Sequence, residues 1–360
     1  MSVKEQRILL VNPYGIGDVL FTTPVLQILK NQLPDAMIGY LCNERVASLL
    51  RDCALIDKIF IFEKDHLKSL WRENRKKCLA KFSFLLAQVK SAKFELALDY
   101  SLSRKFGFFL ALLGIPRRIG FNYRNRGLFL TEKIPLKESS GQHRVSFYCQ
   151  ILTRLGLSFD SIPRISLPLV DSDREGCREF LRLQGIQAGE RFICLHPGGG
   201  LTWGSNARYK RWPAEHFVHL AQLLEQSFRV KFLILGSEAE MDLAKSVSDG
   251  IGPSAINICG QLDLRQLAAV FCASWFAICN DGGPLHLAVS QGTRTISFFG
   301  PVDESVYGPF PREGHLVFTL PVECRPCYRD FRFPSCPFEH RCLRDLGPEE
   351  VFEGIRLEFQ

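Results

Sequence analysis

The stretch Phe276-Ala-Ile-Cys-Asn-Asp-Gly-Gly-Pro-Leu-His-Leu-Ala-Val-Ser-Gln-Gly292, followed by Thr295-Ile-Ser-Phe-Phe-Gly-Pro301, decides the fold. A short apolar run ends in a glycine-rich loop, a helix-compatible segment follows as far as Gly292, and a second apolar run ends at Gly300. This order predicts a strand, a tight loop, a helix and a second parallel strand, joined by a right-handed crossover.

The loop of this unit has the chemistry of an anion site. Gly282 and Gly283 let a ligand approach the backbone closely, and Pro284 suits the first position of a helix. The free amides at the helix N-terminus then favour a phosphate or diphosphate. A purely structural interpretation is also open, in which Asp281 only caps the helix and His286 is only a buried histidine.

The same alternation of strands and helices runs through the rest of the chain. In the first half, strands are predicted at residues 7–12, 37–42, 57–62, 94–99 and 117–121, and helices at 19–33, 68–91, 104–113 and 144–155. A proline-containing linker at 157–173 precedes strands at 192–196, 230–236 and 256–259 and helices at 213–226, from 237, and at 264–272. The pattern predicts an α/β fold with two Rossmann-like, doubly wound domains facing across a cleft.

Composition narrows the class of protein. The 360 residues suffice for two domains, and no apolar run approaches the length of a membrane span. The first residues lead directly into a strand and a glycine loop, so no signal peptide is expected. Several of the 13 cysteines lie in strand or helix patterns, which indicates reduced thiols in a cytoplasm and not a disulfide scaffold.

Positive charge is concentrated in the first half of a chain with a formal net charge of +7. One basic run is Arg72, Arg75, Lys76, Lys77 and Lys81, and a second is Arg117, Arg118, Arg124 and Arg126. These runs are either solvated surface or sites for phosphorylated or carboxylated partners or an anionic membrane face. No nucleic-acid-binding motif accompanies them, so no nucleic-acid partner is expected.

Four motifs in order carry a family resemblance. They are Gly15-Ile-Gly-Asp18, then His196-Pro-Gly-Gly-Gly200 with Lys210-Arg-Trp-Pro213, then Gly236-Ser-Glu238, and finally Asn280-Asp-Gly-Gly-Pro-Leu-His286 with Phe299-Gly-Pro301. Together they resemble the bacterial lipopolysaccharide heptosyltransferases of glycosyltransferase family 9. The resemblance implies a GT-B fold and a metal-independent, inverting transfer of a sugar, typically from ADP-L-glycero-D-manno-heptose, to the lipopolysaccharide inner core.

The resemblance also implies a division of labour. Residues 1–165 are expected to form an acceptor-binding domain and residues 174–345 a nucleotide-sugar-binding domain. Residues 346–360 are expected to form a C-terminal helix that packs back on the first domain. The protein is expected in the cytoplasm, at the surface of the inner membrane where such acceptors are found.

Two residues match the catalytic positions of this family. Asp18, on the first glycine loop, matches the proposed general base, although it could serve only as a helix N-cap. Lys210 matches a lysine that stabilises the departing diphosphate, although it could be an ordinary surface lysine.

Further residues are expected to bind the two substrates. The donor-binding set is Gly198, Gly199, Glu238, Asp281, Gly282, Gly283, Pro284, Leu285 and His286, with Glu240 as the rival of Glu238 for the ribose hydroxyls. No catalytic proton transfer is assigned to His286. The acceptor-binding set is Gly15, Gly17, Arg117, Arg118, Arg124 and Arg126.

Four cysteines near the C-terminus form a separate constellation, which we call the tail cysteines: Cys324, Cys327, Cys336 and Cys342. Four thiolates can bind zinc tetrahedrally, and His340 lies beside them in sequence. Either a structural zinc site or four unligated thiols is compatible with the irregular spacing. No cofactor is expected to be required for catalysis.

Other functions compete with this assignment. The chain could be a GT-B protein that binds nucleotide sugars without transferring them, or a transferase of another sugar. The loop after the heptosyltransferase-like His196 varies among such proteins, so the donor stays open. A nicotinamide oxidoreductase would need a G-x-G-x-x-G loop, and Leu20 occupies the place of the third glycine after Gly15 and Gly17.

Overall fold

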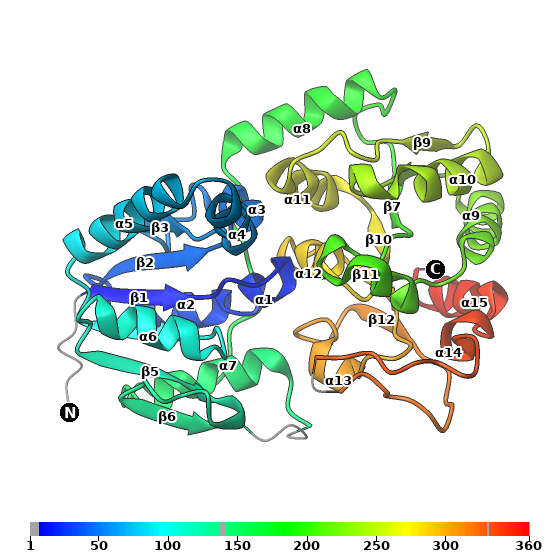
Figure 1. Cartoon of the computed structure of the whole chain (residues 1–360). Coiled ribbons are helices and arrows are strands. Elements are labelled where there is room, and N and C mark those ends of the chain that lie inside the picture. The colour runs from blue at the N-terminus through cyan, green and yellow to red at the C-terminus, as the bar shows by residue number, and fades with distance from the viewer. Residues whose placement is uncertain (1–6, 137–140, 330, 360) are drawn as a thin grey trace. The chain divides into compact units, whose positions relative to one another are not determined.

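Two compact units, which divide between Arg164 and Ile165, make up the chain. The computed structural model describes residues 7–136, 141–329 and 331–359. Each unit contains one parallel six-stranded sheet connected through helices (Figure 1). The predicted α/β class with two doubly wound, Rossmann-like units is therefore confirmed.

The first sheet is built outward from its first strand. Strand β1 (Arg7–Val11) lies in the middle of the order β3-β2-β1-β4-β5-β6, and its Ile8 pairs in parallel register with Ile38 on one side and Leu96 on the other. Four of its five residues are fully buried, as expected for a parallel strand covered on both faces. The remaining strands are β2 (Met37–Cys42), β3 (Lys58–Ile61), β4 (Leu96–Asp99), β5 (Arg117–Asn122) and β6 (Glu132–Pro135).

The helices of the first unit differ from the predicted pattern: the helix predicted at 19–33 is two helices, a helix at Glu44–Leu50 was not predicted, and the helix predicted at 68–91 is also two. The observed helices are α1 (Ile16–Leu20), α2 (Thr23–Gln32), α3 (Glu44–Leu50), α4 (Lys64–Glu73), α5 (Arg75–Ser91), α6 (Arg104–Leu112) and α7 (Arg144–Thr153). The first helix begins inside the predicted glycine loop. The single helix predicted at 68–91 is two helices, because Asn74 is extended and its side chain accepts the Lys77 amide at 3.0 Å, which starts α5 anew.

The second sheet repeats the construction in the order β12-β11-β10-β7-β8-β9. Its strands are β7 (Phe192–His196), β8 (Lys231–Ile234), β9 (Ala255–Asn257), β10 (Phe276–Asn280), β11 (Thr295–Phe298) and β12 (His315–Phe318). Its connecting helices are α9 (Ala214–Phe228), α10 (Met241–Ile251), α11 (Leu264–Ala273), α12 (Gly283–Ser290) and α13 (Glu304–Tyr307), with 3₁₀ segments η2 (Leu201–Lys210) and η3 (Glu238–Glu240). The β10–α12–β11 unit is the one predicted from the opening stretch.

The end of the predicted linker is helical. Helix α8 (Asp171–Leu183) begins two residues before the predicted linker ends, with Asp171 and Asp173 in its first turn. Asp173 accepts the Val170 amide at 3.0 Å at the start of this helix and also forms an ion pair of 2.5 Å with Arg265 of α11, so local and long-range contacts both fix it.

The C-terminal segment belongs to the core of the second unit. After α14 (Arg341–Arg344), helix α15 (Pro348–Phe359) packs against α9 and β12, and its Val351 and Ile355 are fully buried there. The apolar face that the sequence prediction assigned to the first domain is thus buried within the second unit. No helix in the described part of the chain combines the length and apolarity needed to cross a bilayer.

Candidate active site

Two glycine loops meet at the centre of the second sheet. Strands β7 and β10 are neighbours, and the chain continues outward from them in opposite directions. The loops after these strands therefore lie at a topological switch point, where α/β proteins bind ligands. They approach closely, since a Cβ on Gly282 would stand 3.8 Å from the Gly199 carbonyl oxygen. Asn280 ties them together by donating to the Pro197 and Gly198 carbonyls at 2.9 and 3.0 Å.

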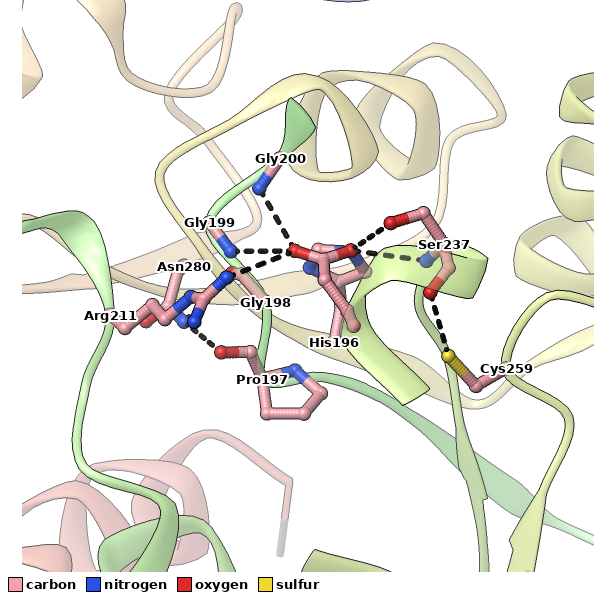
Figure 2. Close-up of polar contacts among 10 residues, drawn as sticks. His196, Pro197, Gly198, Gly199, Gly200, Arg211, Ser237, Cys259 and Asn280 are labelled. Carbon is pink, nitrogen blue, oxygen red and sulfur yellow. Dashed lines mark hydrogen bonds and ion pairs between the residues drawn. The ribbon is translucent and has the colours of Figure 1, made fainter. Parts of the chain in front are cut away.

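The carboxylate of Glu240 holds the loop after β7 in shape through contacts with Gly199, Gly200 and Ser237, which Figure 2 labels. One oxygen accepts the amides of Gly199 at 3.1 Å and Gly200 at 3.3 Å, and the other accepts the Ser237 amide and hydroxyl at 3.0 and 2.8 Å. A guanidinium nitrogen of Arg211 lies 3.7 Å from a carboxylate oxygen of Glu240. Burial alone would raise the pKa of Glu240, but nearby His196 and these hydrogen bonds lower it, so the carboxylate stays charged.

This network explains two of the predicted donor-binding glycines by packing. A Cβ on Gly198 would stand 2.1 Å from a Glu240 oxygen, and one on Gly199 would stand 2.3 Å from the Ala207 carbonyl. Glu240, the rival of Glu238 in the sequence analysis, is buried and fully engaged in this loop. Glu238 is exposed on η3, so its carboxylate is the one that solvent and ligands can reach.

Lys210 is buried in an ion pair. Its Nζ lies 2.6 Å from a carboxylate oxygen of Asp281, and the side chains of both residues are less than a tenth exposed. Trp212 anchors the end of η2, because its amide donates to Asn280 at 2.9 Å and its ring stacks on Phe298. The structure thus excludes the interpretation of Lys210 as an ordinary surface lysine.

Helix α12 begins directly after this pair. Gly282 is its N-cap residue and no side chain caps it, so Asp281 is not the helix cap that the structural interpretation suggested. Gly282 and Gly283 are partly exposed, whereas the side chains of the next residues, including Leu285 and His286, are buried. Any contact of this turn with an anion would therefore come from backbone amides.

The first unit has its own switch point, between β1 and β4. Asp18 lies there in the short helix α1, whose N-cap is Gly15 and which also contains Gly17. Asp18 is not the N-cap. Its carboxylate accepts the Tyr148 hydroxyl at 2.9 Å, and its carbonyl accepts the Asn12 side chain at 2.9 Å.

Several titratable groups lie around Tyr14, which itself lies near Asp18. Burial and the charges of Asp18 and Asp99 raise the pKa of Tyr14, while Arg126 and Arg144 oppose the shift. Burial raises the pKa of Asp99 to about 6, against hydrogen bonds from Ser101. The sequence analysis missed all of these groups except Asp18 and Arg126. The position of Asp99 at the carboxyl end of a predicted strand was the one available signal.

The predicted acceptor arginines fall into two groups. Arg117 donates to Glu132 at 2.6 Å and to the Arg154 carbonyl at 2.8 Å, and Arg118 donates to the carbonyls of Ile115 and Phe129. These two guanidinium groups are engaged in holding β5 and its neighbours. Arg124 and Arg126 are exposed instead, and each guanidinium lies over the ring of Tyr123.

The tail cysteines line one small cavity together with His340, whose ring stacks on Tyr209. All four are free thiols. Within residues 7–136, 141–329 and 331–359, no three His, Cys, Asp or Glu side chains are arranged so that they could hold a metal ion. A structural zinc therefore stays a prediction from the sequence.

Comparison with known proteins decides the family. The profile described as glycosyltransferase family 9 (heptosyltransferase) matches residues 84–332. The chain belongs to glycosyltransferase family 9. Its resemblance to that family is thus confirmed, and so is its GT-B fold. A family 9 structure from Veillonella parvula superposes with a TM-score of 0.83 at 20% identity, covering 99% of this chain and 98% of the other.

Curated relatives of this family 9 chain are heptosyltransferases. Lipooligosaccharide heptosyltransferase 2 of Campylobacter jejuni is 30% identical over 48% of this chain and 52% of its own length, so the match spans about half of each protein. Lipopolysaccharide heptosyltransferase 1 of Pseudomonas aeruginosa is 24% identical over 98% of this chain and 95% of its own.

Proposed function

We propose that this family 9 enzyme is an inverting heptosyltransferase that moves a heptose from an ADP-heptose-type donor to a lipopolysaccharide inner-core-type acceptor. The observation that carries the proposal is the buried Lys210–Asp281 pair at the junction of two glycine loops. Burying two charges costs desolvation free energy that their attraction often does not offset, so the pair is weak evidence of a purely stabilising role. A fixed cation beside an anion site would instead stabilise the departing diphosphate.

The donor is assigned to the second unit. Solved Escherichia coli heptosyltransferases with ADP and with ADP-2-deoxy-2-fluoro heptose superpose with TM-scores of 0.74 and 0.71, which supports an adenine nucleotide. The amides of Gly282 and Gly283 and of the turn that follows Pro284 would hold the diphosphate. Exposed Glu238 would accept the ribose hydroxyls. Gly198 and Gly199 would shape the loop beneath the donor.

The chemical step is assigned to Asp18 and Lys210. The Asp18 carboxylate would take the proton of the acceptor hydroxyl as that oxygen bonds to the anomeric carbon of the sugar. The bond between this carbon and the diphosphate breaks, and the nucleoside diphosphate leaves with the bonding electrons. Lys210 would neutralise the growing charge, which is why we propose that catalysis requires no metal ion.

The acceptor is assigned to the first unit. Residues 100–131 contain six basic and no acidic side chains, and Arg124 and Arg126 of this segment are exposed. Guanidinium groups match the carboxylates and phosphates of an anionic glycolipid.

We infer that acceptor affinity falls as salt rises. Arg124→Gln with Arg126→Gln should raise the acceptor KM, whereas Lys76→Gln with Lys77→Gln, two exposed charges of α5, should not. Equal behaviour of the two variants would make the segment a solvated surface.

An exposed apolar surface adjoins these charges and supports contact with the inner-membrane surface. Phe108 and Leu112 are four residues apart on α6 and, with Leu128, are each more than half exposed. Phe108 contacts the ring of Phe129, and Arg104 lies over that ring, so apolar and basic groups are interleaved. Apolar side chains flanked by cations suit an anionic bilayer surface, where a lipid-anchored acceptor would be found.

The experiment is a donor panel. ADP-heptose should raise the melting temperature more than UDP- or GDP-sugars, because a ligand that binds the native state stabilises it. It should also be consumed only when an inner-core acceptor is present, and the acceptor is offered both without heptose and with a first heptose attached. Binding without transfer would support a nucleotide-sugar-binding protein, and a preference for another sugar would support a different transferase. The heptosyltransferase assignment fails if ADP-heptose neither binds nor reacts.

A further inference from the structure

The proposed base is held by a residue far away in the sequence. Asp18 lies on α1 and Tyr148 on α7, and the Tyr148 hydroxyl donates to one Asp18 carboxylate oxygen at 2.9 Å. A hydrogen bond to an ionised carboxylate is stronger than a neutral one and directs the group in space. This bond therefore influences both where the Asp18 carboxylate lies and how readily it takes up a proton.

Packing holds the Tyr148 side chain, which donates this hydrogen bond, in a fixed position. Tyr148 is 2% exposed, and its ring meets Tyr100 edge to face at 4.9 Å and lies beside Phe121 and Phe147. Helix α7 itself packs against α2, which follows α1 directly along the chain. The hydroxyl is thus presented to Asp18 by a side chain with little freedom to turn away.

The Tyr148 hydroxyl keeps its proton throughout the usable pH range. Burial raises the pKa of Tyr148 well above its ordinary value, the Asp18 charge adds to this, and Arg144 opposes it. Tyr14 and Tyr40 also lie near Asp18, and the charged groups Asp99, Arg126 and Arg144 act on Tyr14. These two tyrosines also have raised pKa values, so they stay protonated as Tyr148 does.

We propose that Tyr148 is a positioning residue for the reaction, one that aims the Asp18 carboxylate and keeps it ionised at the working pH. This inference rests on the proposed function, in which Asp18 is the general base. A donor to the charged form of a carboxylate favours that form. The hydrogen bond from Tyr148 therefore makes Asp18 a weaker base, but it keeps the carboxylate charged and oriented to accept a proton.

The test is Tyr148→Phe, which removes the hydroxyl and keeps the ring. With the donor gone, the acid limb of the pH profile of kcat/KM should move to higher pH by about one unit, since a hydrogen bond to a charged group is worth roughly that much. The value of kcat at neutral pH should fall about 10-fold. The affinity for the nucleotide sugar should stay unchanged, because its binding is assigned to the other unit.

Tyr100→Phe is the matched control. Tyr100 belongs to the same aromatic cluster and is equally buried, and its hydroxyl donates to the Tyr148 carbonyl at 3.4 Å and not to Asp18. Its pH profile should match that of the wild type. Tyr148→Phe should also cost nothing further in an Asp18→Asn background, because the group that it positions is no longer a base.

The outcomes separate this inference from the proposed function. Full turnover of folded Asp18→Asn would overturn the general base, and with it the role of Tyr148. If Asp18→Asn is inactive while Tyr148→Phe keeps the wild-type rate and pH profile, only the role of Tyr148 is overturned. Equal losses in Tyr148→Phe and Tyr100→Phe with an unmoved acid limb would reduce Tyr148 to a packing residue and also overturn the inference.

Discussion

Removing the amine of Lys210 should destabilise the second unit severely, because it leaves Asp281 buried without its counter-ion. Both side chains are less than a tenth exposed, so solvent screens the lost interaction little. Breaking a buried pair at one end costs about 3–5 kcal/mol. In a unit of this size each kcal/mol lowers the melting temperature by about 2–4 °C, so Lys210→Ala should melt about 6–20 °C below the wild type.

The chain offers a control that differs mainly in burial. Lys245 and Asp249 on α10 also stand 2.6 Å apart, but both side chains are more than half exposed. Exposed pairs contribute about 0–1 kcal/mol, so Lys245→Ala should melt within a few degrees of the wild type. Thermal unfolding followed by circular dichroism compares the two variants directly. If they lose the same amount, the buried pair is not what stabilises this loop.

A double variant separates stability from chemistry. Replacing both charges with apolar side chains, as in Lys210→Met with Asp281→Leu, should recover most of the lost stability, because no charge is then buried alone. Turnover should nevertheless stay about 10²–10³-fold below the wild type, because the cation beside the leaving group is gone. A stable double variant with normal turnover would refute the proposed role of Lys210.

The remaining predictions concern single groups. Asp18→Asn should lower turnover by about 10²–10⁴-fold with donor affinity retained, as general-base catalysis implies; steady-state kinetics and donor titration check this. Gly198→Ala should cost about 1–3 kcal/mol in chemical denaturation and weaken donor binding, because its Cβ would stand 2.1 Å from a Glu240 oxygen; an unchanged denaturation midpoint would contradict it. The raised pKa of Asp99, about 6 in the folded state, should cost stability as pH rises from about 4 through 6. Asp99→Asn should therefore gain up to about 3 kcal/mol over the wild type at pH 7.5 and almost nothing at pH 4. EDTA should leave turnover intact, and elemental analysis should find zinc at one equivalent if the tail cysteines bind it; a strict need for added magnesium would contradict metal-independent transfer.

Local patterns in the sequence predicted the fold well where the residues that specify a strand, a turn and a helix lie together in one short stretch. The β10–α12–β11 unit was predicted because apolar runs, two glycines and Pro284 lie together. Strand β6 was missed because Glu132–Pro135 has a single buried residue and no apolar run, whereas β12 was missed although Leu316, Val317 and Phe318 form a short apolar run. The break at Asn74 was missed because α4 and α5 continue the same basic composition across it.

The same distinction, between residues in short motifs and contacts between distant parts of the chain, applies to the candidate site. The sequence singles out Asp18, Lys210 and the glycines because each lies in a short motif. It does not reveal that Tyr148 hydrogen-bonds to Asp18 across 130 positions, or that the Arg117 side chain is occupied by Glu132. Sequence spacing does not reveal which side chains a sheet brings together. Spacing likewise does not reveal that Trp212, two residues after Lys210, stacks on Phe298 of β11.

The clamp of Glu240 on the glycine loop constrains how this enzyme can evolve. Any side chain at position 198 collides with the Glu240 carboxylate, and loss of that carboxylate leaves the Gly199 and Gly200 amides without their acceptor. Each single substitution is therefore harmful, whereas a shorter acid at position 240 would make room for alanine at 198. The two positions should show sign epistasis, so a lineage can change this loop only through a paired replacement. New donor preferences are then expected to arise at freely variable surface positions such as Glu238.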